Sequence, residues 1–347
     1  MTRSKAFFLN GGAGRMLCSI PALEKYEEES GDTDFIMRSK AFFVNGGAGR
    51  VISSIPAFEK YAENHDDFII VCEGGTDMFK GHPTLHKRAY DPWHKNLFES
   101  EIKHRQVVNP EPYQVWEYYN QKCNLSQAFD ILLNEQGVRD LDKPFVKLSH
   151  NEILVGRQIV DEVKQKLKKD KVLVFQPFGR GVEIINETPM DSTGRSFEWA
   201  DVKRLLKIIE KDYGIIMMSE LKMELKGEGL KNEVAMPEGL GLRQWTSVIK
   251  AADHFLGCDS VGQHLSYAVD TETTVVVGST FPINISYPGQ EKLKIVDMGM
   301  KDRQYDPIRI TVDETVNRAN EGIMQMDDNL REYIVGVIKR ENDPDAE

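Results

Sequence analysis

A short segment in the C-terminal half carries the clearest chemical signal in this sequence. The run His254–Gly257 is apolar enough for a buried strand, and Asp259–Gly262 follows it directly. A helix is then expected, with His264 in its first turn. The N–H groups of a helix N-terminus, the helix dipole and a hydroxyl group together favour a bound anion. The alternative is structural, because Asp259 or Ser260 would also cap a helix on which the histidine simply packs.

A glycine-rich loop near the front of the chain is the second candidate ligand loop. The apolar run Lys40–Val44 is followed by a helical pattern, and the loop between them contains Asn45, Gly46, Gly47 and Gly49. Phe68–Cys72 is a second buried strand. Strand, loop, helix and strand in this order open a parallel doubly wound sheet, whose ligands lie at the carboxyl ends of the strands. The glycine loop is therefore expected to face a ligand.

Titratable side chains follow the second of these strands. They are candidates for a general base: Glu73, Asp77, His82 and His86. A base must lie within hydrogen-bond reach of the proton that it removes. Glu73, directly at the strand end, is our first choice. Its structural alternative is an ordinary carboxylate in a turn.

The segment Ala252–Thr280 resembles glycosyltransferase family nine, the heptosyltransferase-like enzymes of the two-Rossmann GT-B fold. The shared pattern is a strand, Asp-Ser/Thr, His-Leu, a small helix, a Val-rich strand and Gly-x-Thr. Asn45–Pro56 resembles the family's N-terminal glycine loop and helix. Gln176–Leu206 resembles its segment with a basic residue, a tryptophan and a helix, and here the first two are Arg195 and Trp199. The resemblance spans most of residues 38–290.

The resemblance implies a metal-independent, inverting transfer of a sugar from a nucleotide-diphosphate donor to a saccharide or other hydroxyl acceptor, without a cofactor. It assigns the donor diphosphate to six residues: Ser260, Val261, Gly262, His264, Arg195 and Thr280. Negative charge grows on the leaving diphosphate, and fixed N–H groups and cations stabilise such charge. Asp140-Leu141-Asp142 and Asp32-Thr33-Asp34 have DxD spacing, but we assign them to a helix end and a turn. No metal site is therefore predicted.

One position departs from the family. The resemblance places a catalytic Asp just after the glycines, and Arg50 stands there in this chain. Either another residue deprotonates the acceptor, or the chemistry differs, or activity is lost. Loss of activity would leave a non-catalytic protein that binds sugar nucleotides.

Two further functions compete with sugar transfer to a saccharide. Gly47-x-Gly49 after a strand, with Glu73 where a ribose-binding acid would lie, suggests an NAD-dependent oxidoreductase. Ile52 replaces the third glycine of that fingerprint, and the segment after residue 252 has no role in it. A phage-type enzyme that glycosylates DNA bases is the other alternative. The lysine cluster Lys164–Lys171 favours it, although such a run usually ends a solvated helix.

Composition narrows the class of protein. The chain has 347 residues, 40% hydrophobic and 29% charged, which suits about two globular domains. The 44 basic and 55 acidic residues give a net charge of −11, which opposes binding of a polyanion such as DNA. Four widely spaced cysteines exclude a zinc ribbon and argue against a disulfide framework. No apolar run approaches the ~20 residues of a membrane span, and no signal peptide is evident. We expect a cytoplasmic chain.

The beginning of the chain contains a repeat. Residues 3–26 and 38–61 differ at only five of 24 aligned positions, all conservatively. The second copy continues into Phe68–Cys72, whereas the first is interrupted at Met37 by the second. We therefore interpret 1–36 as a truncated duplicate of the N-terminal βα unit. The alternative is that both copies serve as βα units of one larger sheet.

Hydrophobic periodicity predicts two doubly wound domains, and the resemblance implies that they face each other across a cleft as acceptor and donor domains. We expect an N-terminal acceptor domain over 37–168, a C-terminal donor domain over 169–325, and a helix with an acidic tail over 326–347. Further helices are predicted over 126–133, 151–167, 198–212, 242–252, 263–269 and 328–339. Further strands are predicted over 172–175, 214–218 and 273–277. Residues 76–120 are expected to be irregular.

Overall fold

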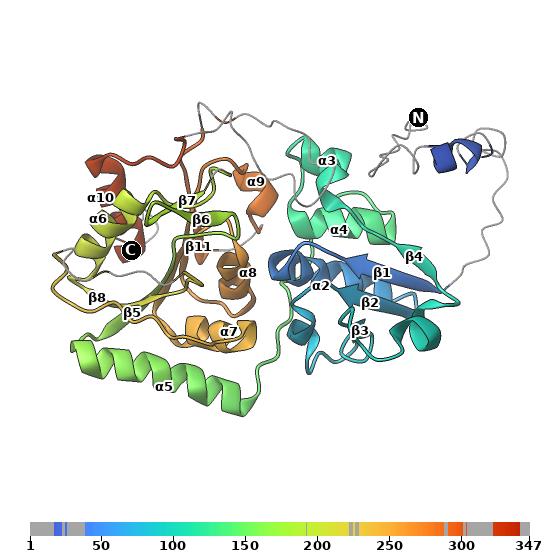
Figure 1. Ribbon diagram of the computed structural model, residues 1–347, viewed down its shortest axis with the longest axis horizontal. Coiled ribbons are helices and arrows are strands. Elements are labelled where there is room, and N and C mark those ends of the chain that lie inside the picture. Colours follow the sequence, from blue (N-terminus) through green and yellow to red (C-terminus); the bar gives the residue numbers. More distant parts are fainter. Residues whose placement is uncertain are drawn as a thin grey trace.

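The computed structural model describes residues 17–22, 25, 39–191, 193–221, 225, 229–287, 291–300, 303 and 322–340. Two α/β domains lie side by side (Figure 1). Residues 17–22 form a short helix that lies apart from both domains in this view. The strand expected for the first repeat copy lies outside the described residues. The truncated duplicate therefore stays a prediction, and the described strands of the N-terminal sheet all come from residues after 39.

The N-terminal domain is a parallel sheet with the strand order β3-β2-β1-β4. Its strands are β1 (Lys40–Val44), β2 (Phe68–Cys72), β3 (Ala89–Tyr90) and β4 (Gln106–Val108). The helices are α2 (Ala48–Ala62), α3 (Trp116–Tyr119) and α4 (Leu125–Asn134), with single turns η1 (Thr76–Phe79), η2 (Phe98–Ile102) and η3 (Pro112–Gln114). The expectation of an irregular region over 76–120 was wrong for β3 and β4, which are too short to show a strand pattern.

Apolar residues explain why the second repeat copy occupies the centre of this domain. All five residues of β2 are buried, as expected for a strand covered on both faces. Helix α2 buries Val51, Ile55 and Phe58 against the sheet, at the spacing of one helical face. Phe42 and Phe58 meet edge to face, with ring centroids 5.4 Å apart.

The C-terminal domain is a five-stranded sheet with the order β11-β10-β9-β5-β8, in which every paired strand is parallel. The strands are β5 (Lys171–Gln176), β8 (Tyr213–Met217), β9 (His254–Cys258), β10 (Thr273–Val277) and β11 (Leu293–Asp297). The helices are α5 (His150–Leu167), α6 (Trp199–Ile209), α7 (Leu242–Ala251), α8 (Val261–Ala268), α9 (Pro282–Ile285) and α10 (Asp328–Lys339). An antiparallel hairpin, β6 (Val182–Ile185) and β7 (Thr188–Asp191), follows β5 and was not predicted.

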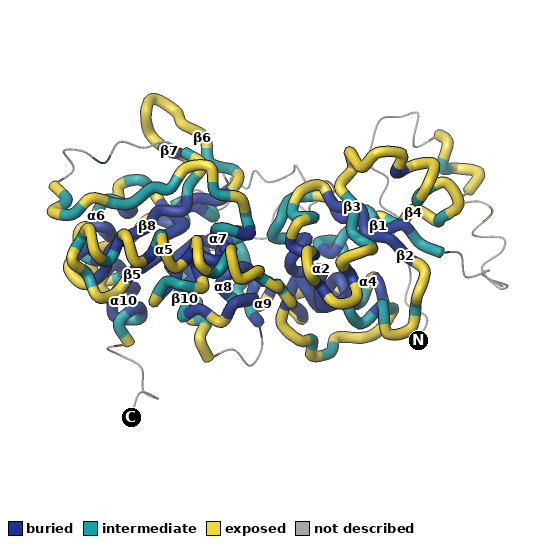
Figure 2. Tube along the Cα trace, turned by 90° about the horizontal axis from the view of Figure 1, so that it is seen from below, coloured by how far each residue is buried: buried dark blue, intermediate teal, exposed yellow. Residues whose placement is uncertain are grey.

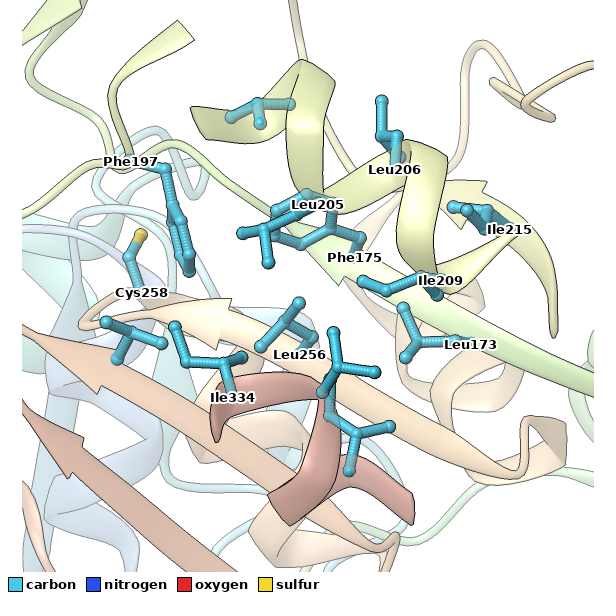
Figure 3. Close-up of a cluster of buried hydrophobic side chains, with 14 of the residues drawn as sticks. Leu173, Phe175, Phe197, Leu205, Leu206, Ile209, Ile215, Leu256, Cys258 and Ile334 are labelled. Atoms are coloured by element: carbon cyan, nitrogen blue, oxygen red, sulfur yellow. The ribbon is translucent and has the colours of Figure 1, made fainter. Parts of the chain in front are cut away.

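Two apolar layers cover the C-terminal sheet. Figure 3 shows one of them, in which α6 and α10 pack on Leu173, Phe175 and Leu256 of the strands. The opposite layer contains α5, α7 and α8, and it also takes in Ile52 and Met78 of the N-terminal domain. The two domains are therefore joined by a continuous apolar contact.

Helix α5 shows how the chain passes between the domains. The predicted boundary at residue 168 places α5 in the N-terminal domain, whereas its apolar face packs on α7, β5 and β8. Figure 2 shows its outer face exposed and the β6–β7 hairpin projecting from the domain. The exact boundary stays a prediction, as does the acidic tail, which lies outside the described residues. Within the described part of the chain, no helix is both long and apolar enough to cross a bilayer.

The strand orders determine where loops can hold a ligand. In a doubly wound sheet the ligand crevice lies where the order reverses. In the N-terminal sheet this point lies between β1 and β4, and in the C-terminal sheet between β5 and β9. The glycine loop leaves β1 and the Asp259–Gly262 segment leaves β9, so both segments emerge at these points.

Candidate functional site

The side chain of Gln176 forms two hydrogen bonds with the start of α8. This residue ends β5, beside β9, and its Nε2 donates to Ser260 Oγ over 3.2 Å. Its Oε1 accepts the N–H of Gly262 at 2.9 Å. The Gly262 N–H is thus already occupied, whereas the N–H groups of Ser260 and Val261 form no hydrogen bond among the described residues. Two of the three predicted main-chain donors remain available for an anion.

Hydroxyl groups connect the neighbouring loops at this edge through hydrogen bonds. Ser196 Oγ accepts the Gly179 N–H at 2.9 Å and donates to Asp191. Thr280 Oγ1 donates to Asp259 Oδ2 at 2.6 Å. The structure therefore brings Thr280 to the predicted edge, where its side chain acts on Asp259. The loops after β5, β7, β9 and β10 form one hydrogen-bonded group.

Two arginines at this edge have no carboxylate partner among the residues that the structure describes. Arg195 Nε donates only to Thr193 Oγ1, at 3.3 Å. Arg180 is exposed and forms no ion pair or hydrogen bond with any described residue. Sequence reasoning found Arg195 but missed Arg180 and Gln176, although both directly follow or end β5. The rule that ligands meet strand ends would have found them.

The glycine loop of the N-terminal domain meets this edge directly, and α2 and α8 lie next to each other in Figure 1. A Cβ on Gly49 would lie 3.2 Å from the His264 ring and 3.8 Å from the Val261 Cα. A Cβ on Gly47, whose φ is +91°, would lie 3.7 Å from an Arg180 guanidinium nitrogen. Glycine at these positions lets two helix N-termini and a cation approach within van der Waals distance.

Both helix N-termini are free of acidic side chains. Neither α2 nor α8 has an acidic residue in its first turn, and neither has a side-chain cap. Their dipoles therefore present partial positive charge to the same region. Asp259, whose carboxylate accepts from Thr280, is the acidic group of the α8 loop.

His264 lies buried between the domains. Its Nδ1 is hydrogen-bonded to the Tyr287 hydroxyl and lies 3.3 Å from Ser53 Oγ. Burial lowers the pKa of His264 to about 4 and raises the pKa of Tyr287, so the imidazole is neutral and the phenol protonated at pH 7. In the tautomer in which Tyr287 donates to Nδ1, the imidazole carries its proton on Nε2. No described residue binds Nε2, which lies beside Gly49.

Arg50 does not face the ligand side. Only 3% of this residue is exposed, and its guanidinium donates to Glu111 Oε2 and to the Pro110 carbonyl, each at 3.2 Å. The guanidinium also lies over the Tyr113 ring, 5.0 Å from the centroid. Its inclusion in the ligand loop therefore needs correction, because the side chain turns into its own domain. Glu111 was missed, since its pairing with Arg50 spans 61 residues of sequence.

Three of the four base candidates that follow β2 have different surroundings. Glu73 is exposed, and its Oε2 accepts the Gly46 N–H at 3.3 Å, so the structure places it on the glycine loop. Asp77 has an exposed side chain, and its carbonyl accepts from Arg243 at 3.1 Å. His82 is buried, with Nε2 2.9 Å from Glu59 and Nδ1 accepting the N–H groups of Thr84 and Leu85. Both nitrogens of His82 are occupied.

The remaining candidates lie elsewhere. Asn45 and Gly46 are on the loop after β1, whereas His86 is exposed and has no hydrogen bond to a described residue. Asp140 and Asp142 lie in the irregular segment between α4 and α5, and not at a helix end. Among the described residues, no group of three His, Cys, Asp or Glu side chains has an arrangement that could hold a metal ion.

Solved structures share this architecture. A glycosyl transferase of family 9 from Veillonella parvula matches with a TM-score of 0.57 at 9% identity, over 89% of this chain and 98% of that one. The E. coli ADP-heptose LPS heptosyltransferase II matches with 0.54 at 10% identity, over 87% and 99%. TibC, an iron-containing heptosyltransferase of enterotoxigenic E. coli solved with ADP-D-β-D-heptose, matches with 0.51 at 12% identity, over 88% and 76%.

No protein-family model and no curated protein matches the sequence. The chain has the two-domain GT-B fold. Both domains are included in the matches, since nearly the whole of this chain and of the first two structures is aligned. The predicted fold class is confirmed, and the resemblance to family nine is confirmed at the level of the fold.

Proposed function

We propose that this protein is a glycosyltransferase that moves a sugar from a nucleotide-diphosphate donor to a hydroxyl acceptor. The observation that carries the proposal is the meeting of α2 and α8 N-termini beside two arginines without carboxylate partners. This arrangement suits a diphosphate, because it concentrates N–H donors and positive charge at one place. The fold supports it, since TibC of the same fold was solved with ADP-heptose.

The donor residues take distinct roles in this proposal. Ser260 and Val261 donate their free N–H groups to the diphosphate, and His264 donates from Nε2. Gly262 acts by close packing, because its N–H is held by Gln176. Arg195 and Arg180 neutralise the charge that grows on the leaving group, so that no metal or cofactor is required. Thr280 acts indirectly, by holding Asp259.

Glu73 is the proposed general base. As the acceptor oxygen attacks the anomeric carbon, the bond to the diphosphate breaks and the hydroxyl proton passes to the carboxylate. The exposed position of Glu73 on the glycine loop supports this role, whereas both ring nitrogens of His82 are occupied. Attack from the side opposite the diphosphate inverts the anomeric carbon. The acceptor is proposed to be a saccharide, since a net charge of −11 disfavours DNA.

Thermal unfolding with ADP-, UDP-, GDP- and CDP-sugars tests the proposal. A donor at about 100 times its Kd stabilises the folded protein by ~2.7 kcal/mol, which a melting curve resolves. We expect one nucleotide class to raise the Tm, and Arg195→Met to reduce the rise. The matched control is Arg204→Met, an exposed arginine of α6. Stabilisation by NAD(H) without any response to sugar nucleotides would instead indicate the oxidoreductase.

The position of Arg50 favours a second candidate, a protein that binds sugar nucleotides without transferring the sugar. Arg50, at the position of the family's base, is buried and pairs with Glu111, so its side chain does not face the ligand side. Release of nucleoside diphosphate in the presence of an acceptor, followed by chromatography, separates the two. Donor binding with no release above the rate in buffer would support the binding protein.

A further inference from the structure

A pocket of about 260 Å³ lies between the domains, apart from the arginines of the diphosphate site. The N-terminus of α4 and the segment 140–142 line one side of it. Tyr267 and Tyr287 of the C-terminal domain line the other, with their rings stacked at a centroid distance of 3.8 Å. Ligand pockets usually measure ~300–1,000 Å³, so a pocket of this size suits a single small ring.

Polar groups line one wall of this pocket. Ser126 is 3% exposed, and its hydroxyl lies close to Tyr287, where a hydrogen bond between the two side chains lowers the pKa of the phenol against the larger effect of burial. Asn124 caps α4 through Oδ1, which accepts the Gln127 N–H at 2.9 Å, and this leaves its Nδ2 protons without a described partner. The amide of Asn124 can therefore donate to an oxygen of a ligand in the pocket.

Acidic side chains determine which ligand fits. Asp140 and Asp142 are exposed at the pocket and form no ion pair with a described residue. Ionised carboxylates only accept hydrogen bonds and repel an anion, which excludes a phosphate. They pair well with hydroxyl groups, whereas Asn124 Nδ2 donates and Ser126 does both. The tyrosine pair adds an aromatic wall for the apolar face of a ring.

We infer that this pocket binds one monosaccharide unit through its hydroxyl groups. The inference stands on the pocket and its polar and aromatic lining, and it does not require the diphosphate site. Tyr287 lines the pocket and is hydrogen-bonded to His264. The Tyr287 side chain would therefore separate an occupant of the pocket from His264 of the proposed donor site.

Ligand-observed NMR on the full chain tests the inference with glucose, mannose, galactose, glucosamine and glucose 1-phosphate. We expect a saturable signal from at least one uncharged or amino sugar and none from the phosphate. Asp142→Asn removes an exposed charge without touching the core, and Asn124→Asp keeps the α4 cap while removing the Nδ2 donor. Each should weaken binding about tenfold, the typical worth of a hydrogen bond to a charged group. Glu332→Gln, an exposed carboxylate of α10, is the matched control.

The outcomes separate this inference from the proposed function. Arg195→Met should leave monosaccharide affinity unchanged while weakening nucleotide binding. If no sugar gives a saturable signal, or if both pocket variants bind like the control, the pocket is not a saccharide site. If sugars bind but no sugar nucleotide does, the proposed transferase fails and the pocket stands.

Discussion

The two domains use the same strand, loop and helix at their facing edges, but the charged side chains go opposite ways. In the N-terminal domain the arginine of the loop, Arg50, is buried against Glu111, and the carboxylate of Glu73 stays exposed on the loop. In the C-terminal domain Arg180 and Arg195 stay without carboxylate partners, and the acidic Asp259 is held by Thr280. The N-terminal edge thus offers a proton acceptor, and the C-terminal edge offers cations.

This difference shows that the function of an edge depends on which charges find partners within their own domain. Neither α2 nor α8 has a side-chain cap or an acidic residue in its first turn. The backbone N–H groups of both helix N-termini therefore contribute partial positive charge from the two sides. In the proposed function, the exposed carboxylate of one edge would activate an acceptor and the arginines of the other edge would hold a leaving group. Four substitutions test this division.

Glu73→Gln should have the largest effect on turnover. Loss of a general base typically costs about 10²–10⁴ in rate. We expect kcat for sugar transfer to fall by this range while the Tm shift with the sugar nucleotide stays unchanged. Glu63→Gln, an exposed carboxylate paired with Lys60, serves as the control. Equal turnover of the two variants would remove Glu73 from the role of base.

Arg50→Asp introduces the aspartate that the resemblance to family nine implies at this position, and we expect it to harm the protein. The new carboxylate would face Glu111 in a buried site and leave both without a cation. Breaking a buried ion pair costs about 3–5 kcal/mol, which urea unfolding measures. A stable variant with raised turnover would show that position 50 serves the ligand, and the contrast between the edges would fail.

Arg195→Met and Arg180→Met should each weaken sugar-nucleotide binding about tenfold, because each removes a charge-assisted contact to the diphosphate. Calorimetric titration of the nucleoside diphosphate measures the loss. We expect the effect to diminish at high salt, since exposed charges are screened. If Arg180→Met binds the nucleoside diphosphate as tightly as the Arg204→Met control does, Arg180 is not part of the diphosphate site.

The smallest effect compares two buried histidines, His254 of β9 and His264 of α8. Burial lowers the pKa of both His254 and His264 to about 4, below the ~6.5 of the unfolded chain. The unfolded state therefore binds more protons between these values, and stability falls as pH decreases from about 6.5 to 4. We expect His264→Gln and His254→Gln to flatten this slope similarly in urea titrations.

Nucleotide binding distinguishes the two histidine variants. His254 lies at the amino end of β9, with Nε2 3.0 Å from Thr274 Oγ1, so His254→Gln should leave nucleotide affinity unchanged. His264→Gln should lower it, because Nε2 of His264 faces the glycine loop. Equal affinity in both variants would remove His264 from the donor site.

Local pattern was enough to predict most of the fold. The strands β1, β2, β5, β8, β9 and β10 have continuous apolar runs, and α2, α6 and α7 have apolar faces at helical spacing. These features depend on neighbours in sequence, so the doubly wound domains and the glycine loop follow from them. The short strands β3 and β4 were not predicted, because their pairing with the sheet, and not their composition, makes them strands.

The sequence by itself determined which residues lie at strand ends and therefore which loops meet a ligand. Only the tertiary structure decided which side chains remain free there. Arg50 and Arg195 both follow a strand by a few residues, yet one has Glu111 within reach and the other has no carboxylate. A charge is available to a ligand only when the folded chain has not already neutralised it, and that depends on partners far away in sequence.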